Sequence, residues 1–138
     1  MENEKLRIER ATQSDADEIY ALYHSLVSMP YGTWNEEYPS RQLVEEDLQI
    51  NDVFVMRDGK RIVSAIVNED TDEFADMASW YPDVKRWAQL CRLGVAADMQ
   101  GRGIAKRMLV HAMEEKKKDG CEAVRFLVAD GNVVAQRA

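Results

Sequence analysis

Two glycines spaced one residue apart, Gly101 and Gly103, stand just before a predicted helix in the segment DMQGRGIAKRML at residues 98–109. A strand, a glycine turn and a helix start together form an anion site, because the first amides of a helix lack internal partners and the helix dipole adds positive charge. Glycine also lets a phosphate approach the backbone closely. Arg102, Lys106 and Arg107 supply charge nearby. The pattern favours a small polyanion, and a tight turn without a ligand is the alternative.

Two other phosphate-binding motifs are absent from the sequence. A P-loop requires G-x-x-x-x-G-K-[ST], which the chain lacks. A dinucleotide-binding turn needs a third glycine where Lys106 stands, and it normally belongs to an early strand–helix–strand unit. We therefore expect neither of these two classes of nucleotide site.

Composition indicates a small globular protein. The 138 residues are 46% hydrophobic, enough for a single domain over residues 1–138, and no apolar run approaches the ~20 residues of a membrane helix. The N-terminus lacks the apolar core of a signal peptide. Cys91 and Cys121 are too few for a disulfide framework and form no C-x-x-C pair. We expect a cytoplasmic protein without a bound metal or a membrane contact, and a homodimer is compatible with its size.

The net charge of −7 is unevenly distributed. Residues 1–76 hold 18 acids and 7 bases, whereas residues 77–138 hold 7 acids and 11 bases. An acidic chain is a poor partner for nucleic acid, so we expect none. The basic half suits a small polyanion and the acidic half suits a cation, although charges that only solvate the surface would produce the same pattern.

Hydrophobic periodicity and turn residues predict the order β-α-α-β-β-β-α-β, followed by the start of a helix. This order predicts an α/β (α+β) fold with a mixed, mostly antiparallel central sheet and helices on both faces. The expected elements are a strand at 6–11, a helix capped by Thr12 or Ser14, a loop at 28–40, a helix at 40–50, a hairpin within 53–68 turning at Asp58-Gly59, an irregular insertion at 69–87, strands at 88–95 and 122–128 around a helix from Ile104 to Gly120, and a helix beginning within 130–138.

The segment LGVAADMQGRGIAKRML at residues 93–109 resembles the pyrophosphate-binding motif Q/R-x-x-G-x-G/A of the GNAT acetyltransferase superfamily. Gln100, Gly103 and Ala105 occupy its fixed positions. The preceding strand, the capped first helix, the hairpin and the following strand agree with the family's element order. The resemblance implies an acyl-CoA N-acyltransferase fold that binds acetyl-CoA between the two parallel strands around the glycine-turn helix.

Carried over residue by residue, the resemblance assigns acetyl-CoA contacts to two backbone segments. The amides from Gly101 to Ala105 would hold the pyrophosphate, and the strand segment ending in Val95 would pair with the pantetheine arm and polarise the thioester carbonyl. The Gln100 side chain is expected to stabilise the turn, and the side chains of Ile104 and Met108 to lie in the core. The implied cofactor-binding residues are Leu93, Gly94, Val95, Gln100, Gly101, Arg102, Gly103, Ile104, Ala105 and Asn132.

The family reaction is direct attack of an amine on the thioester, and an alkylammonium with a pKa near ~10 must first lose a proton. Many members carry a glutamate four residues before the strand valine, where this chain has Cys91. The base is therefore unassigned. Glu36, Glu37 and Asp83 are the candidates, whereas His24 and His111 are expected to be surface or half-buried residues. An acyl-cysteine at Cys91 and a merely packed thiol are the two alternatives for that residue.

The C-terminal segment NVVAQRA resembles the start of the family's next helix, N-x-x-A-x-x-L-Y, through Asn132 and Ala135. Ala138 stands one residue before the tyrosine that commonly assists the leaving thiolate, and the family's last two strands would follow it. The resemblance therefore implies either a shortened member or a piece of a longer chain.

The acceptor site of the family usually lies at the loop between the first two helices. This places Tyr31, Trp34 and Tyr38 near the substrate, beside the acidic half of the chain. Aromatic rings and carboxylates suit an ammonium group, so the expected acceptor is a small amine, an amino-acid derivative or a peptide N-terminus. The rival interpretations are a coenzyme A-binding module without catalysis and a structural domain with a tight glycine turn.

Overall fold

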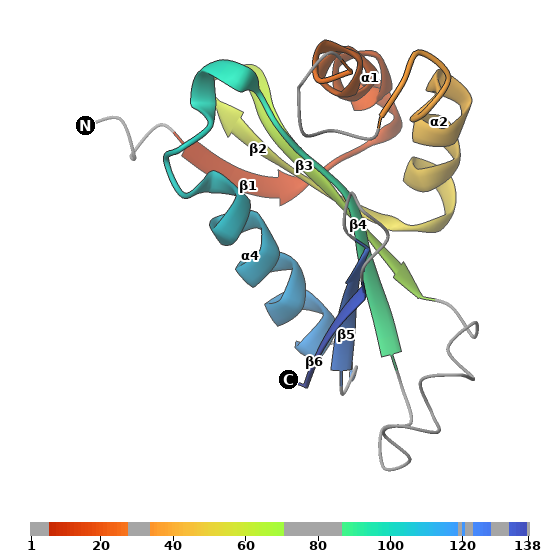
Figure 1. The fold of residues 1–138 in the computed structure, drawn as a ribbon, viewed down its shortest axis with the longest axis vertical. Coiled ribbons are helices and arrows are strands. Elements are labelled where there is room, and N and C mark those ends of the chain that lie inside the picture. Colours follow the sequence, from red (N-terminus) through yellow and green to blue (C-terminus); the bar gives the residue numbers. More distant parts are fainter. Residues whose placement is uncertain are drawn as a thin grey trace.

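The computed structural model describes residues 6–27, 34–70, 87–118, 120, 123–127 and 133–137 (Figure 1). Six strands form one sheet in sequential order, and every neighbouring pair is antiparallel except β4 and β5, which are parallel. The elements are β1 (Leu6–Arg10), α1 (Ala16–Ser25), α2 (Arg41–Ile50), β2 (Asp52–Asp58), β3 (Arg61–Asp70), β4 (Trp87–Val95), α4 (Ile104–Lys118), β5 (Ala123–Leu127) and β6 (Val133–Arg137), with 3-10 turns at Gln13–Asp15 and Ala97–Met99.

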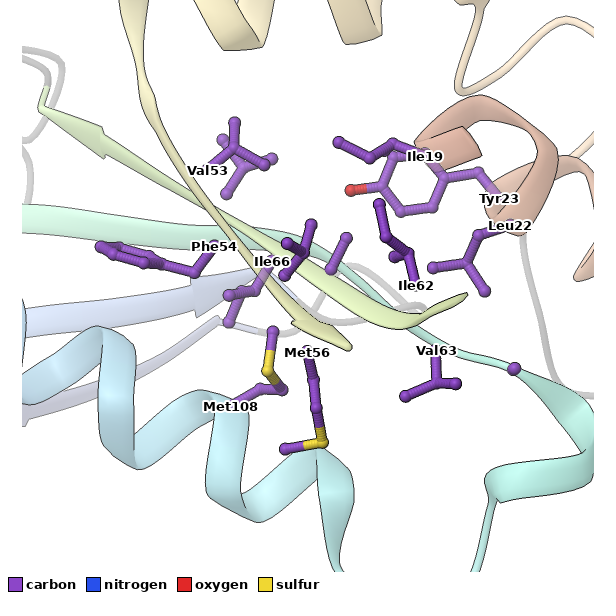
Figure 2. Close-up of a cluster of buried hydrophobic side chains, with 14 of the residues drawn as sticks. Ile19, Leu22, Tyr23, Val53, Phe54, Met56, Ile62, Val63, Ile66 and Met108 are labelled. Atoms are coloured by element: carbon purple, nitrogen blue, oxygen red, sulfur yellow. The ribbon is translucent and has the colours of Figure 1, made fainter. Parts of the chain in front are cut away.

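The helices lie on both faces of this sheet, so the predicted fold class is confirmed. α1 and α2 cover one face and α4 covers the other (Figure 1). Figure 2 shows Ile19 and Tyr23 of α1 packed on one side of the strands, with Met56 and Met108 on the side of α4. Alternate side chains of a strand point to opposite faces, which is why the hydrophobic strands β2 and β3 supply both cores. No helix in the described ranges is long and apolar enough to cross a membrane.

The helix starts are fixed by local polar contacts. The amide of Thr12 donates to the Asp15 carboxylate at 2.9 Å, just before α1. Ser40 caps α2, because its hydroxyl accepts a hydrogen bond from the Leu43 amide at 3.0 Å. These side chains satisfy backbone groups that the first helical turn leaves without partners. The two helices of the N-terminal half therefore begin close to where the sequence predicts.

Two predictions within the hairpin need correction. Asp58 lies opposite Arg61, so the two turn residues are Gly59 and Lys60 and not Asp58 and Gly59. Only Gly59 has a positive φ, of 62°, which agrees with a type II′ turn instead of a type I′ turn. β3 also continues through Asp70, because antiparallel pairing with β4 extends to Asp70 opposite Ala88. The expected irregular segment therefore begins later than Glu69.

The predicted C-terminal helix is wrong. Residues Val133–Arg137 form β6, which runs antiparallel to β5 with Ala135 opposite Arg125. The two consecutive valines favour an extended chain, which finds hydrogen-bond partners along β5. Asn132, expected at the start of that helix, lies outside the described residues.

A half-buried ion pair ties α1 to the sheet. Arg57 of β2 donates to Asp15 at 2.8 Å and also contacts Glu9 of β1. Partial burial opposes ionisation of Asp15, but the hydrogen bond and charge of Arg57 outweigh it and hold the pKa of Asp15 below its ordinary value. This carboxylate therefore stabilises the fold only while it is ionised.

We predict that Asp15→Asn lowers the free energy of unfolding by about 1–3 kcal/mol at neutral pH, because Arg57 loses a charged partner. The folded pKa is lowered, so the stabilisation is present above the unfolded pKa and disappears as the pH falls through the folded value. Urea unfolding at pH 7 and pH 3 should show the two proteins converging in acid. Asp17→Asn, which affects a carboxylate that is 88% exposed, is the control and should change stability little. A constant difference at both pH values would contradict this account.

Candidate functional site

The two parallel strands stay paired over only part of their length. β4 pairs with β5 from Trp87 to Leu90, opposite Ala123 to Phe126. Beyond Leu90, no strand in the described part of the chain pairs with that edge of β4, while β3 continues to pair with the other edge as far as Val95. Residues 91–95 therefore form a strand edge with which no described strand is paired, and such an edge can pair with an extended ligand.

A β-bulge marks the place where β4 leaves β5. Ala65 lies opposite Gly94 and Val67 lies opposite Cys91, so two residues of β4 oppose one residue of β3. The first of the two is Arg92, whose φ of 50° is in the left-handed region. Among the non-glycine residues that the structure describes, Arg92 alone has a positive φ. A bulge of this kind bends the strand and ends regular pairing, which explains the divergence from β5.

The glycine turn lies at the N-terminus of α4, after β4. Gly101 and Gly103 have φ values of 81° and 78°, and a Cβ at either position would meet no atom within 4 Å. The amide of Arg107 donates to the Gly103 carbonyl at 3.1 Å, which closes the first helical turn. The amides of the preceding helical residues have no partner inside the helix. The turn is thus an exposed cradle of backbone donors with room for an anion.

Side chains connect this turn to the sheet. Gln100 donates to the Val95 carbonyl at 3.0 Å, which agrees with the expected role of Gln100 in holding the turn. Arg61 at the start of β3 forms a bidentate pair with Asp98 at 2.7 and 2.8 Å. The glycine turn is therefore held at the end of the open edge of β4.

The predicted cofactor residues accordingly fall into two adjoining groups. Leu93, Gly94 and Val95 lie on the open edge of β4, and the residues from Gln100 to Ala105 form the turn and the first residues of α4. The side chains of Ile104 and Met108 are buried in the core, as expected.

Gly94 allows a close approach between β4 and α1. A Cβ there would lie 3.0 Å from Leu26 Cδ1, 3.3 Å from Tyr23 Cδ1 and 3.4 Å from Trp34 Cη2. Trp34 also packs edge-on against Tyr23, with ring centroids 5.0 Å apart. Trp34, one of the aromatic residues predicted for the acceptor site, therefore lies against Gly94, next to the bulge.

The bulge residue Arg92 is the centre of a polar network. Its guanidinium donates to Asp47 of α2 at 2.7 and 2.6 Å and to Glu69 of β3 at 2.9 Å. A longer contact of 3.4 Å reaches the hydroxyl oxygen of Tyr38. Burial opposes its charge, but the hydrogen bonds that the guanidinium donates to Asp47 and Tyr38, together with the negative charge of Asp47, raise the pKa of Arg92. It is therefore a permanent cation.

The two carboxylates in this network differ in exposure. The Asp47 side chain is 4% exposed and also accepts from Asn51 at 3.1 Å, whereas the Glu69 side chain is 23% exposed. Glu69 accepts a further hydrogen bond from Gln89 at 2.8 Å. Two carboxylates paired with one guanidinium leave a net negative charge. Glu69 is the carboxylate of the two that is partly exposed to solvent. No local motif connects Asp47, Glu69 and Arg92, so the sequence alone does not point to this network.

The structure describes two of the three aromatic residues predicted for the acceptor site. Trp34 and Tyr38 both reach the bulge, through Gly94 and Arg92 respectively. Tyr31 lies outside the described residues. The structure therefore brings two of the three predicted aromatic residues next to the predicted cofactor edge.

The predicted base candidates are exposed side chains of the 34–40 segment or lie outside the described residues. Glu36 is exposed and lies 2.7 Å from His24 Nε2, and Glu37 is also exposed. Asp83 is outside the described residues. His111 packs edge-on against Phe54 on the α4 face, with ring centroids 4.9 Å apart. Of the described carboxylates, Glu69 is the one in direct contact with the bulge residue and partly open to solvent.

Cys91 is a buried thiol next to the bulge. It is 3% exposed, and burial raises the pKa of its thiol to about 12. Because the thiolate is the reactive form, this thiol is a poor nucleophile at neutral pH. The geometry favours the packed-thiol interpretation over an acyl-cysteine. Among the described residues, no three histidine, cysteine or carboxylate side chains are grouped as a metal site would need.

Comparisons with known proteins agree with this geometry. Residues 19–138 match the model of the acetyltransferase (GNAT) family. A search of curated proteins finds no match. An aminoglycoside acetyltransferase from an uncultured soil metagenomic sample, solved in complex with sisomicin, is 20% identical with a TM-score of 0.68, and the match covers 93% of this chain and 80% of that chain.

Two further solved structures share the fold. A GNAT family acetyltransferase from Brucella melitensis in complex with acetyl-CoA is 16% identical with a TM-score of 0.68, covering 89% of this chain and 75% of that chain. The loading GNATL domain of CurA from Lyngbya majuscula has the same identity and TM-score, and the match covers 89% of this chain. The chain spans only 64% of the length of that domain.

We predict that Cys91 resists alkylation by iodoacetamide at pH 8 in the folded protein, because a thiol with a pKa of about 12 is almost entirely protonated there. The measurement is mass spectrometry of a Cys121→Ser variant, with the urea-unfolded protein as the control that must react. Rapid modification of the folded protein would contradict the packed-thiol assignment.

Proposed function

Because the chain belongs to the GNAT acetyltransferase family, we propose that it transfers the acetyl group of acetyl-CoA to an amine by direct attack in a ternary complex. The observation that carries the proposal is the position of the glycine turn at the end of the open edge of β4. The glycine turn offers backbone donors to an anion, and the open edge of β4 offers a strand edge to an extended arm.

The residues of the turn fit a pyrophosphate. The space beside Gly101 and Gly103 is free of protein atoms, and both glycines are exposed. The amides from Gly101 to Ala105 would donate to the phosphate oxygens. Arg102, which is exposed on the turn, would add positive charge. Acetyl-CoA supplies the activated acetyl group, and this chain's residues hold and orient it.

The open edge of β4 would orient the reacting group. Backbone groups of Leu93 would pair with the pantetheine arm, and the Val95 amide would donate to the thioester oxygen as negative charge develops there. The carbonyl of the same peptide group, that of Gly94, accepts a hydrogen bond from the Ser64 hydroxyl of β3 at 2.7 Å. Gln100 holds the carbonyl of the next peptide, that of Val95. A positioned backbone donor of this kind lowers the barrier without any proton transfer.

The surroundings of the bulge favour a cationic acceptor. Trp34 and Tyr38 offer aromatic surface, and Glu69 offers a partly exposed carboxylate that retains acceptor capacity on both oxygens. The acceptor class that fits is a small amine or a peptide N-terminus. The similar structure solved with an aminoglycoside is consistent with this class.

A coenzyme A-binding module without catalysis is the alternative. The observation in its favour is that a buried thiol stands at position 91, where many members of the family carry a glutamate. Turnover of acetyl-CoA with a broad panel of amines separates the enzyme from the binding module. A binding module would bind acetyl-CoA without releasing coenzyme A as a free thiol.

We predict that Gly103→Val weakens acetyl-CoA binding about tenfold or more, because the side chain enters the space proposed for the phosphates and the residue needs a positive φ. Calorimetric titration measures the change. Gly120→Val is the matched control, since Gly120 also has a positive φ but lies beyond the other end of α4. Equal loss of binding in both folded variants would point to a general loss of structure and contradict the phosphate site.

We predict that Glu69→Gln raises the KM for a cationic acceptor about tenfold, which corresponds to about 1.4 kcal/mol for one charged contact, and leaves the KM for acetyl-CoA unchanged. Steady-state kinetics with the best amine of the panel checks this. Glu46→Gln on the exposed face of α2 makes the same chemical change away from the bulge and should have no effect. An unchanged acceptor KM in Glu69→Gln would remove Glu69 from the acceptor site.

A further inference from the structure

Arg92 occupies a backbone conformation that its side chain does not favour. Its φ of 50° lies in the left-handed region, which glycine adopts freely and long side chains adopt at an energetic cost. The residue nevertheless stands at the position where β4 and β5 separate. A non-glycine residue persists in such a conformation only when its surroundings hold it there.

Four separate segments hold this one residue. Tyr23 of α1 donates its hydroxyl hydrogen to the Arg92 carbonyl at 2.9 Å, and this carbonyl belongs to the bulge. The guanidinium binds Asp47 of α2 and Glu69 of β3, and it approaches Tyr38 of the segment between the two helices. Backbone and side chain of the bulge are thus restrained together.

The geometry of these contacts requires an arginine. Two nitrogens of one guanidinium face the two oxygens of Asp47 in a bidentate pair, and one of them also reaches Glu69. The side chain is only 9% exposed, so losing either partner would leave a charge nearly buried. A lysine carries the charge but lacks the planar arrangement of donors.

We propose that Arg92 is a positioning residue for acyl transfer, which locks the β4 bulge so that the backbone from Leu93 to Val95 is aligned with the thioester while α2 and the 34–40 segment are held beside it. The inference rests on the proposed function. It adds that one residue, Arg92, connects the proposed acceptor site to the β4 backbone proposed to hold the coenzyme. The role requires no contact between Arg92 and either substrate.

A purely structural ion pair is the competing explanation, and the chain contains a suitable comparison. Arg57 also joins two carboxylates, Glu9 and Asp15, and its side chain is 15% exposed. It lies in β2 and is bonded to β1 and the start of α1, away from the open edge of β4. If buried arginine networks only stabilise the fold, Arg57→Gln and Arg92→Gln should both lower the melting temperature, and neither should have a specific effect on kcat.

The test compares three variants with the wild-type protein: Arg92→Gln, Arg92→Gly and Arg57→Gln. Arg92→Gly keeps the positive φ without strain, so its effect comes from the lost guanidinium and not from the backbone conformation. For each folded variant, we would measure the melting temperature, the Kd for coenzyme A by calorimetry and the kcat with the best amine of the panel. Guanidinium chloride at a sub-denaturing concentration would then be added to Arg92→Gly as a chemical rescue.

The proposal expects kcat to fall about tenfold or more in the Arg92 variants, because misalignment at the reacting bond affects the transition state most strongly. The Kd for coenzyme A should stay within about threefold, since the glycine turn is untouched, and added guanidinium should restore part of kcat in Arg92→Gly. Arg57→Gln should lose stability and keep its kcat.

Three results would overturn the positioning role while leaving acetyl transfer intact. These are a kcat within about twofold of wild type in Arg92→Gly, an equal fall in Arg57→Gln, or a fall in Arg92→Gly that follows only its loss of stability and is not restored by guanidinium. Wild-type protein that binds coenzyme A but releases no thiol with any amine would instead refute the proposed function. The two failures are therefore distinguishable.

Discussion

A strand can pair along both edges only while its backbone is regular, and β4 stops being regular at Arg92. The left-handed residue adds a bulge against β3, and pairing with β5 has already ended at Leu90. The open edge that follows is the part of the molecule that can accept a ligand as an additional strand. The rest of the described structure supports this irregularity: α1 and α2 hold the bulge from one face of the sheet, and α4 brings the glycine turn to its far end.

The candidate site consists mainly of backbone groups. Open space beside Gly101 and Gly103, a helix start and a strand edge require few particular side chains. A short motif therefore suffices for the proposed coenzyme site, although identity to the three solved structures described above is only 16–20%. The proposed acceptor side differs, because it would depend on side chains such as Trp34 and Glu69. Members of one fold can therefore share the coenzyme and differ in acceptor, and function has to be argued from the site.

Local signals explain what the sequence could predict. The glycine turn, the cap near Thr12 and the hairpin are each encoded within a few neighbouring residues, and all are present. The Asp47–Arg92 pair joins residues 45 apart, and Glu69 lies 23 residues from Arg92, so no periodicity or motif connects them. The sequence pattern and the resemblance to a family motif both predict the start of a helix at 133–137, whereas strand pairing with β5 determines its structure.

The most direct test of the central claim is to map which backbone amides respond to coenzyme A. Proton–nitrogen NMR spectra recorded during titration report each amide separately and require neither turnover nor a known acceptor. The account predicts that the largest shifts fall in two stretches, residues 93–95 of β4 and residues 101–105 of the glycine turn, with amides of β1 and the exposed face of α2 unchanged. Shifts concentrated elsewhere, or in the glycine turn without the strand edge, would contradict the proposal that the bulged strand and the turn form one site.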